Sequence, residues 1–310
     1  MRWPGGPAVQ AGIALAALAL LPLVLGGWAL GFVAKTMVYA IAALSLELLV
    51  GGTGLVCFGQ AAFFGIGAYA AALLPWPAAV LPAGIAAAAL YALAVGALSL
   101  RTRGVYFIMV TLAFAQMAYY VAHDTPLAGG SDGVYLYAKP SLGPGLELDR
   151  PLVFYGCALA SLALVFGGLA LLRRSRFGRA LAGIRANEQR MRAAGYSTYA
   201  YKLAAFTVSG AIAGLGGVLF ALADGYVNPE LLSWHFSGAA LIMVILGGIG
   251  HLRGAVVGAF AFALLQELFK SEAVFGAWSR HWQLGLGLTI IACVAGLPRG
   301  LIGLVSRAPR

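Results

Sequence analysis

The chain has 310 residues, of which 62% are hydrophobic and only 10% are charged. A soluble domain has about a quarter of its residues charged, so this composition excludes a soluble globular protein. It predicts a protein whose helices are solvated by lipid. The three cysteines, Cys57, Cys157 and Cys293, are isolated in apolar runs, and they indicate neither a disulfide framework nor a metal site.

The apolar runs predict an all-α, polytopic transmembrane helical bundle with about 8–10 spans in a single domain, residues 1–310. The expected spans are 8–34, 36–56, 57–74, 78–100, 104–122, 151–172, 203–223, 237–250, 254–269 and 282–297. The first apolar stretch is longer than the core of a signal peptide, so we expect a retained helix. Several of the later runs are short or interrupted by glycine.

The basic residues predict the orientation of this bundle, because Lys and Arg gather in cytoplasmic loops. With the N-terminus inside and the spans alternating, most of the 20 basic residues fall on the inner side. Only Lys35, Lys139, Arg150, Lys270 and Arg280 fall outside. We therefore expect both termini to be cytoplasmic, and we read the net charge of +10 as a topology signal rather than a nucleic-acid surface.

Two polar loops interrupt the apolar pattern. The outer loop, 123–150, contains a Gly-Gly-Ser-Asp-Gly stretch formed by Gly129, Gly130, Ser131, Asp132 and Gly133. The inner loop, 173–202, is rich in arginine and contains one acid, Glu188.

Within the inner loop, residues 177–195 have the periodicity of a short amphipathic helix. At about 100° per residue, Phe177, Leu181, Ile184, Glu188 and Met191 share one face. Gly195 stands where a helix C-cap is expected. Such a helix either lies on the membrane surface or docks in a groove on a cytoplasmic partner, and the periodicity favours neither.

Two glycine-rich stretches, 51–59 and 247–254, resemble each other weakly and lie in the two halves of the chain. Glycine-broken apolar segments at corresponding positions indicate a transport path in repeat-built transporters. The alternative is helix packing, because Gly250, Gly254 and Gly258 form a ladder of small residues. Glu47 precedes the first stretch inside an apolar run, where an acid is expected to face a cavity, a partner or an interface.

The sequence offers no sign of catalysis or of nucleotide binding. It has no Gly-Lys dipeptide and therefore no Walker A loop. The four histidines, His123, His235, His251 and His281, are isolated and form no metal motif. We expect no catalytic residue, no metal and no cofactor bound by this chain.

Several motifs, in order between about residues 40 and 304, carry a family resemblance. They are LLVGGTGLVCFGQAAFFGIGAY at 48–69, RGVYFIMVTLAFAQM at 103–117, GGSDG at 129–133, SRFGRAL at 175–181, IRANE at 184–188, MVILGGIG at 243–250 and PRGL at 298–301. Together they resemble the M-type permease subunit of branched-chain amino acid ABC transporters. The chain departs from that family's pattern at Glu47, Cys57, Gln60, His251, Arg253 and Ala255.

The resemblance implies a subunit of an ATP-driven importer in the bacterial inner membrane. Its implied partners are a second, H-type permease, two cytoplasmic ATPase subunits that bind the ATP, and a periplasmic substrate-binding protein. The usual cargo is Leu, Ile and Val, and relatives carry urea, short amides or aromatic acids.

The resemblance also implies roles for individual residues. The positions expected to dock on the ATPase are Phe177, Gly178, Arg179, Leu181, Ile184, Arg185, Asn187, Glu188 and Gly195. Those expected to shape the translocation path are Glu47, Gly51, Gly52, Gly54, Gly59, Gln60, Gly247, Gly248 and Gly250. The outer loop at 129–133 is expected to help receive the binding protein.

The residues themselves leave other functions open. A proton-coupled secondary transporter could use Glu47 or His251, and a channel-like pore would work without any motor. An intramembrane enzyme has no positive support in the sequence.

Overall fold

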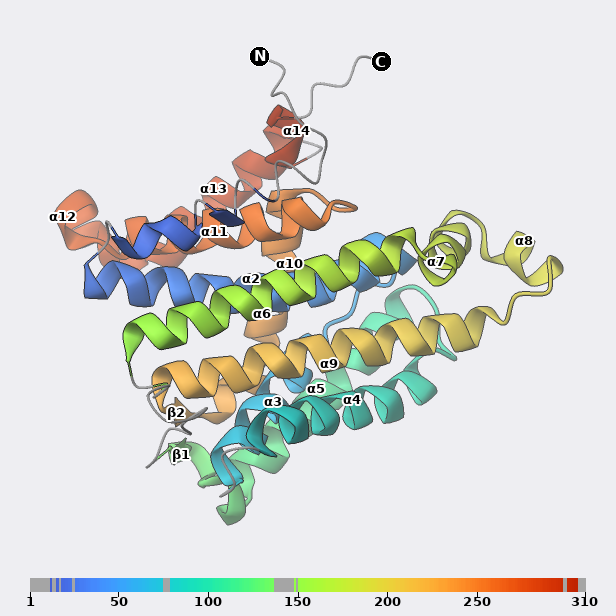
Figure 1. The fold of residues 1–310 in the computed structure, drawn as a ribbon, viewed down its shortest axis with the longest axis horizontal. Helices are drawn as coiled ribbons and strands as arrows, with labels where there is room; N and C mark the ends of the chain where they lie inside the picture. Colours follow the sequence, from blue (N-terminus) through green and yellow to red (C-terminus); the bar gives the residue numbers. More distant parts are fainter. Residues whose placement is uncertain are drawn as a thin grey trace.

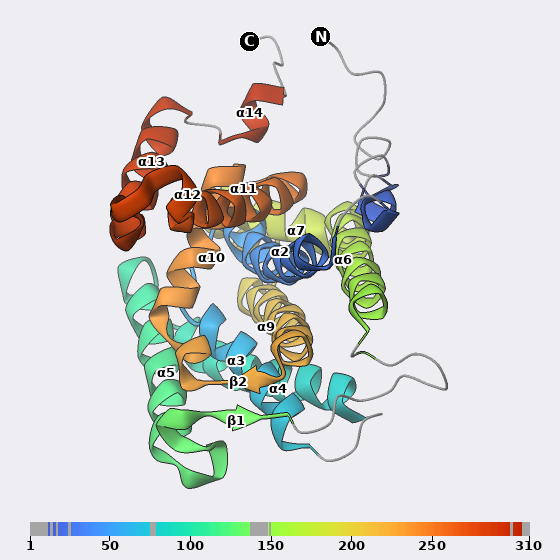
Figure 2. The same ribbon diagram turned by 90° about the vertical axis from the view of Figure 1, so that its left-hand side faces the viewer.

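The computed structural model describes residues 12, 15–16, 18–23, 26–74, 79–136, 148, 150–297 and 300–305. Within this part, long helices run side by side (Figure 1). Two of them, α2 (Gly27–Thr53) and α9 (Thr198–Asp224), are in contact and occupy the centre of the bundle (Figure 2). Most of the α2 span is buried by its neighbours, since 83% of its apolar window is inside the protein.

Six described helices are long and apolar enough to cross a membrane. They are α2, α4 (Val80–Ser99), α5 (Val105–Asp124), α6 (Pro151–Arg174), α9 and α11 (Leu252–Lys270). Most of the α4, α5 and α6 spans is not buried by the protein, and leucines such as Leu90 and Leu164 stay exposed on them. Apolar surface of this kind is solvated by lipid, which confirms the predicted polytopic helical bundle.

Three further apolar helices are shorter: α3 (Gln60–Leu73), α10 (Trp234–Gly247) and α13 (Trp282–Gly296). A 14-residue helix such as α3 or α10 is about 21 Å long, less than the bilayer core of about 30 Å. The smaller elements are η1 (Leu21–Leu23), η3 (Pro126–Ala128), η4 (Gly130–Asp132), α7 (Arg176–Ala186), α8 (Glu188–Ala193), η5 (Pro229–Leu232), α12 (Glu272–Phe275), η6 (Gly276–His281) and α14 (Ile302–Val305).

The two half-length helices α3 and α10 are arranged in opposite directions. After α2 ends, residues 54–59 run back into the bundle as non-helical chain, and α3 begins beside the middle of α2. After α9 ends, residues 225–233 fold back in the same way, and α10 begins beside the start of α3. From there α3 runs toward η5 and β2, whereas α10 runs toward the opposite end of the bundle. This is the inverted arrangement of broken helices found in repeat-built transporters.

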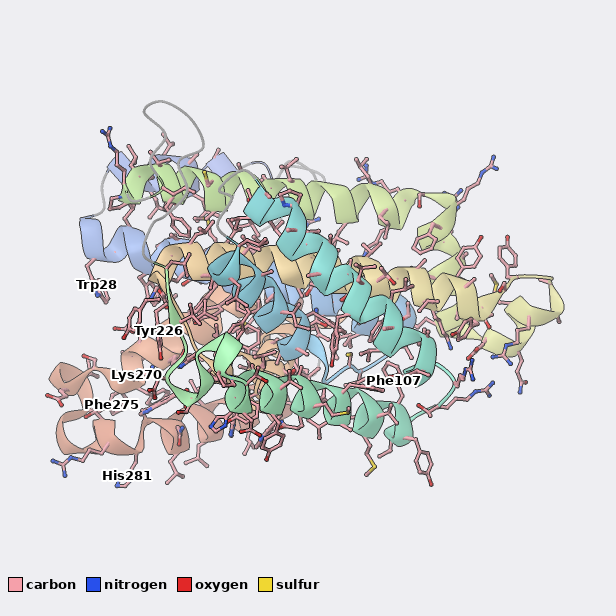
Figure 3. All side chains as sticks on the ribbon, turned by 90° about the horizontal axis from the view of Figure 1, so that it is seen from below. Trp28, Phe107, Tyr226, Lys270, Phe275 and His281 are labelled. Carbon is pink, nitrogen blue, oxygen red and sulfur yellow. The ribbon has the colours of Figure 1, made fainter. Side chains whose placement is uncertain are left out.

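The bundle has two chemically different ends. One, here named the α7 end, carries α7, α8 and the loop 100–104 (Figure 1). The other, named the β1 end, carries a two-stranded antiparallel sheet of β1 (Val134–Tyr135) and β2 (Tyr226–Val227). Trp28, Tyr226 and Lys270 lie toward the β1 end (Figure 3). Lys270 stands 4.6 Å from the ring centroid of Trp282 there, an amphipathic pair typical of a membrane interface.

The structure corrects one predicted boundary and two predicted spans. The boundary at residue 35 between the first two spans lies inside α2, and Lys35 is instead paired with Asp224 at 2.5 Å near the β1 end. An apolar helix carries one lysine without ending when a carboxylate from a neighbouring helix meets it. The runs 57–74 and 237–250 are not full spans, because each contains a helix of only 14 residues, α3 or α10. Five of the 20 basic residues that predicted the orientation lie outside the described residues: Arg2, Lys139, Arg299, Arg307 and Arg310.

Candidate functional site

The inner loop forms a two-part arm at the α7 end. The hydroxyl of Ser175 caps α7 by accepting a hydrogen bond from the Gly178 amide at 3.2 Å. The helix stops at Asn187, whose extended backbone begins a second helix, α8, and whose side chain accepts a hydrogen bond from the Arg190 amide at 2.9 Å. The prediction of one helix over 177–195 is therefore wrong. Asparagine is favoured at the N-cap of a helix and has a low propensity for the interior of one, which explains why α7 ends and α8 begins at Asn187.

The apolar side of this α7–α8 arm is turned toward the protein itself. Leu181 and Ile184 are buried, and Phe177 stacks on Tyr201 of α9 with ring centroids 5.4 Å apart. Elsewhere on the arm, Arg179 and Gln189 are exposed to solvent. The apolar stripe therefore anchors the arm to the bundle, and its polar face remains free for a partner.

Glu188 fastens the arm to α9. Its carboxylate pairs with Lys202 at 2.7 Å and with Arg192 at 2.5 Å, and it accepts a hydrogen bond from Thr198 at 3.1 Å. Burial opposes ionisation of this carboxyl, but hydrogen bonds and charge from Lys202, then Arg192 and Thr198, lower the pKa of Glu188 to about 2. Glu188 is therefore a fixed anion within the arm.

The predicted C-cap at Gly195 is confirmed. Its φ of 85° is left-handed, a conformation that glycine adopts without strain. Its amide bonds the Arg192 carbonyl at 2.9 Å, and the Tyr196 amide bonds the Met191 carbonyl at 3.1 Å. These two bonds form a Schellman motif, which ends α8 and turns the chain into α9.

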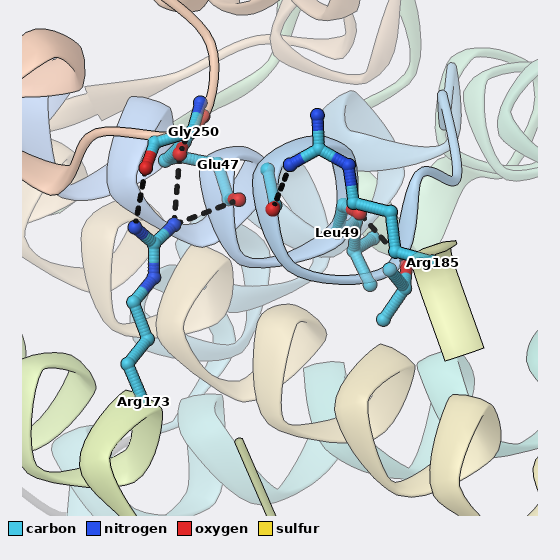
Figure 4. A network of polar contacts seen from close by, with 7 residues as sticks. Glu47, Leu49, Arg173, Arg185 and Gly250 are labelled. Carbon is cyan, nitrogen blue, oxygen red and sulfur yellow. Dashed lines mark hydrogen bonds and ion pairs between the residues drawn. The ribbon is translucent and has the colours of Figure 1, made fainter. Parts of the chain in front are cut away.

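The second group of site residues surrounds Glu47, which is fully buried in α2 (Figure 4). One carboxylate oxygen accepts hydrogen bonds from the Arg173 guanidinium at 2.8 Å and from the Gly250 amide at 2.9 Å. Arg173 also donates to the Gly250 carbonyl at 2.9 Å. A buried acid is tolerable when it is paired in this way. The contacts join α2, α6 and the α10–α11 hairpin at one point.

Arg185 extends this group into the arm. Its guanidinium donates a short hydrogen bond to the Gly51 carbonyl in the last turn of α2 (Figure 4). The last carbonyls of a helix have no partner within it, and they carry the negative end of its dipole. The arm is thus fastened to α2 through Arg185 and to α9 through Glu188.

The third group is the non-helical segment 54–59 at the head of α3. The Phe58 amide donates to the Thr111 hydroxyl at 3.3 Å. The Ser237 hydroxyl of α10 donates to the Phe58 carbonyl at 2.7 Å and accepts from the Ala61 amide at 2.9 Å. Backbone groups inside a membrane must be satisfied by the protein, and these two hydroxyls satisfy them.

Gln60 begins α3 at the centre of the bundle, and it is fully buried. Its side-chain amide donates to Ser45 of α2, with a short hydrogen bond, and to Ser209 of α9 at 3.3 Å. The Ser209 hydroxyl in turn donates to the Ser45 carbonyl at 2.7 Å. This central polar cluster of Ser45, Gln60 and Ser209 joins the two central helices at the point where α3 starts.

The glycines near 247–258 serve mainly close packing. A Cβ on Gly247 would overlap the Gly254 carbonyl, and one on Gly258 would overlap the Met243 carbonyl. Gly250 does not continue the ladder of small residues, because it lies in the hairpin with a φ of 95°. The stretches 51–59 and 247–254 are not structural counterparts either, since the first precedes α3 and the second follows α10.

Three of the predicted path glycines line cavities: Gly54 at the α7 end, and Gly248 and Gly250 around the α10–α11 hairpin. Of the others, Gly51 adjoins the Glu47 carboxylate, Gly59 lies against the Thr111 carbonyl, and Gly52 closes the last turn of α2. Their role in translocation stays a prediction.

The outer loop is described as far as residue 136, and residues 137–147 lie outside the described part. Gly129, Gly130 and Gly133 all have left-handed φ values, between 59° and 78°. Ser131 and Asp132 lie in a 3-10 turn between them, and the Tyr226 hydroxyl donates to the Asp132 carbonyl at 2.7 Å. The GGSDG stretch is therefore a tight turn that leads into β1 at the β1 end.

Sequence reasoning missed Ser45, Thr111, Ser209 and Ser237, and it treated Arg173 only as a topology signal. Hydroxyl residues inside apolar spans were the available signal, because they form hydrogen bonds between membrane helices. No group of three or more His, Cys, Asp or Glu side chains in the described part is placed to hold a metal ion.

Comparisons with known proteins relate this chain to permease components of transport systems. The family model described as "Branched-chain amino acid transport system / permease component" matches residues 9–295. The chain is 32% identical over 298 residues to the high-affinity branched-chain amino acid transport system permease protein LivM of Escherichia coli K12, covering 86% of this chain and 68% of LivM.

Shorter matches are to two other permease proteins of Escherichia coli. The autoinducer 2 import system permease protein LsrC, of strain HS, is 29% identical over 48% of this chain and 46% of LsrC. The xylose transport system permease protein XylH, of strain K12, is 31% identical over 34% of this chain and 28% of XylH. No solved structure matches. Since the family model covers nearly the whole chain, and LivM matches over most of it, this protein belongs to the family of branched-chain amino acid transport system permease components.

Proposed function

We propose that this chain is the membrane-spanning permease subunit of an ATP-binding-cassette importer that moves branched-chain amino acids from the periplasm to the cytoplasm. Family membership supports the transport role. The observation that carries the motor-driven mechanism is the α7–α8 arm, which presents a polar face and is fastened to both central helices by Glu188 and Arg185. An arm of this kind passes a force applied at its surface directly to the spans.

The α7 end faces the cytoplasm in this proposal, and both termini are cytoplasmic. The exposed arginines of the arm, together with Arg101 and Arg103 of the loop 100–104, lie at that end. Asp124 and Asp224 end their helices at the other. The positive-inside rule assigns the arginine-rich end to the inner side.

The partners are also part of this proposal. Two ATPase subunits bind ATP and hydrolyse it below the membrane, with one docked on the arm, so this chain needs no cofactor of its own. An H-type permease completes the membrane core, and a periplasmic binding protein delivers cargo near the GGSDG turn at 129–133. These partners are proposed from the family pattern and from the two exposed polar elements.

The path is proposed to pass the broken segments, where α3 and α10 begin together at mid-depth. Helices that start inside a membrane present the positive ends of their dipoles to a permeating carboxylate. The residues assigned to the path remain Glu47, Gly51, Gly52, Gly54, Gly59, Gln60, Gly247, Gly248 and Gly250. The cargo is proposed from LivM, which covers more of the chain than LsrC or XylH.

The test is purification of the tagged chain from its native membrane in mild detergent, with mass spectrometry of the proteins that accompany it. A second permease and ATPase subunits are expected. Recovery of the chain alone, or of copies of itself only, would overturn the proposal. A secondary transporter or a channel-like pore would then explain uptake, and flux through this chain alone in liposomes would distinguish those two.

A further inference from the structure

A cavity of about 510 Å³ opens beside the α7–α8 arm. Its walls are the end of α2 at Thr53–Leu55, the loop 100–104 that joins α4 to α5, the arm, and the first turns of α9. It lies at the α7 end, away from the central polar cluster, and two residues described above, Gly54 and Arg185, line it.

The lining of this cavity is strongly basic. Its cationic side chains are Arg101, Arg103, Arg185, Arg192 and Lys202, and its one acid is Glu188. Glu188 is already paired with Arg192 and Lys202, so it neutralises none of the others. A concave wall lined by one sign of charge focuses its field and attracts groups of the opposite sign.

Arg101 and Arg103 supply charge that the described residues do not neutralise. Both are exposed, and neither guanidinium has an ion pair or hydrogen bond within the described part of the chain. Arginine presents its donors in a planar fork that matches a carboxylate in a bidentate way. The geometry therefore suits carboxylate groups that come from outside this chain.

The backbone beneath these two arginines is fixed in place. The Thr102 hydroxyl donates to the Ser99 carbonyl at 2.7 Å, and the Leu100 amide donates to the Gly96 carbonyl at 3.0 Å. The Tyr199 hydroxyl, in the first turn of α9, donates to the Ala97 carbonyl at 2.8 Å. The last turn of α4, from which the loop 100–104 begins, is thus tied to α9, and the arm is tied to the same helix through Glu188.

We propose that this cavity receives acidic side chains of the ATPase subunit, which makes the loop 100–104 a second contact for that partner beside the α7–α8 arm. The inference rests on the proposed importer function. Two features favour a protein partner over a lipid headgroup. The arm that forms one wall projects beyond the ends of the spans (Figure 1), and the cavity adjoins the free polar face of that arm. One partner surface can therefore cover both the cavity and the polar face of the arm.

The test uses the double variant Arg101→Glu/Arg103→Glu in the complete importer, in nanodiscs of purely zwitterionic lipid. Its matched control is Arg174→Glu/Arg280→Glu, which makes the same charge change at exposed residues outside both this cavity and the α7–α8 arm. Retention of the ATPase by the tagged permease is measured from about 50 to about 500 mM salt, because screening weakens exposed ion pairs. A cysteine introduced as Thr102→Cys then carries a cross-linker, and the linked peptide is identified by mass spectrometry.

We expect the Arg101/Arg103 variant to bind the ATPase about tenfold more weakly than wild type at low salt, with the difference shrinking as salt rises. The control should bind as wild type does, and the cross-link should map to an acidic ATPase segment. Unchanged retention in the variant, while wild type still recovers the ATPase, overturns this inference and leaves the importer function intact. A defect that appears only when anionic lipid is present also overturns it, because lipid would then be the occupant. Failure of wild type to recover any ATPase overturns the proposed function itself.

Discussion

The Glu47 carboxylate accepts a hydrogen bond from Arg173 at 2.8 Å, across 126 residues of sequence. Glu47 is fully buried in α2, whereas Arg173 stands near the end of α6 and is partly exposed. The same pair holds the α10–α11 hairpin through both backbone groups of Gly250. Three elements that are distant in sequence therefore meet at one ion pair, next to the point where Arg185 reaches α2.

Arg173→Ala is expected to destabilise the protein by about 3 kcal/mol, because it leaves the buried Glu47 carboxylate without its cation. Glu47→Gln should cost much less, since a side-chain amide oxygen still accepts from Arg173 and from the Gly250 amide. Thermal unfolding of the purified protein in detergent shows which of the two variants is the less stable.

The double variant Glu47→Ala/Arg173→Ala separates a charge effect from a packing effect. If the unpaired charge is the cause, the double variant should be more stable than Arg173→Ala alone. Additive losses in the two single variants would show instead that the pair contributes only its packing.

A pair of glycines tests the close packing of α10 on α11. Gly258→Ala places a methyl group against the Met243 carbonyl, so the two helices must separate, and we expect a loss of about 1–3 kcal/mol. Gly238→Ala in α10 meets nothing within 4 Å, and it should gain up to about 1 kcal/mol from helix propensity. Opposite shifts in melting temperature are the expected result. Shifts of the same sign would mean that the α10–α11 contact is looser than the structure shows.

Much of the fold could be predicted from the sequence, because lipid imposes a simple rule on span length and composition. Runs such as 104–122 and 151–172 lie within three residues of the boundaries of α5 and α6 at each end. The span boundary at Lys35 was predicted wrongly, because hydropathy treats a lysine as the end of a span. It cannot show that Asp224 of α9 pairs with this lysine. The glycines in 51–59 indicated a broken helix. They did not indicate that its counterpart in the other half of the chain is the segment 225–233 before α10.

The site was less predictable, because its contacts join distant parts of the chain. Periodicity placed Leu181 and Ile184 on one face of α7, but it could not show that the face packs on the protein itself. No local pattern links Glu47 to Arg173, or Gln60 to Ser209. Gly195 was predictable, since a C-cap depends on local backbone conformation alone.

Ser237→Ala is expected to loosen the start of α3. The variant leaves the Phe58 carbonyl and the Ala61 amide without partners inside the bundle, at a cost of about 2 kcal/mol. Thr207→Ala is the control, because its hydroxyl only adds a second bond to the Leu203 carbonyl within α9. The melting temperatures of the two variants are compared. Equal decreases would contradict a special role for Ser237.

The arm should lose order in acid through Glu188. Its pKa falls from an ordinary 4.5 to about 2 in the folded protein. The stabilisation is therefore complete above about pH 4.5, and it is lost as the pH falls toward 2. Hydrogen exchange of the α8 amides, compared between wild type and Glu188→Gln at each pH, should show protection in wild type at pH 6 and a shrinking difference below pH 4. A difference that stays constant across this range would contradict the pairing.

The proposed mechanism makes its sharpest prediction at two residues that hold the arm against α9, the cap Gly195 and the anion Glu188. Gly195→Pro cannot adopt the left-handed φ of 85°, and Glu188→Lys sets a cation against Arg192 and Lys202. Both changes lie outside the spans, so both variants should insert and assemble. ATP hydrolysis should continue in each while amino acid uptake per ATP falls several-fold, because a loosened arm no longer moves α9. Glu272→Lys, which makes the same charge change at an exposed residue outside the arm, should keep normal coupling. Fully coupled uptake in both Gly195→Pro and Glu188→Lys proteoliposomes would remove the arm from the mechanism, since the force would then have to reach the spans by another contact.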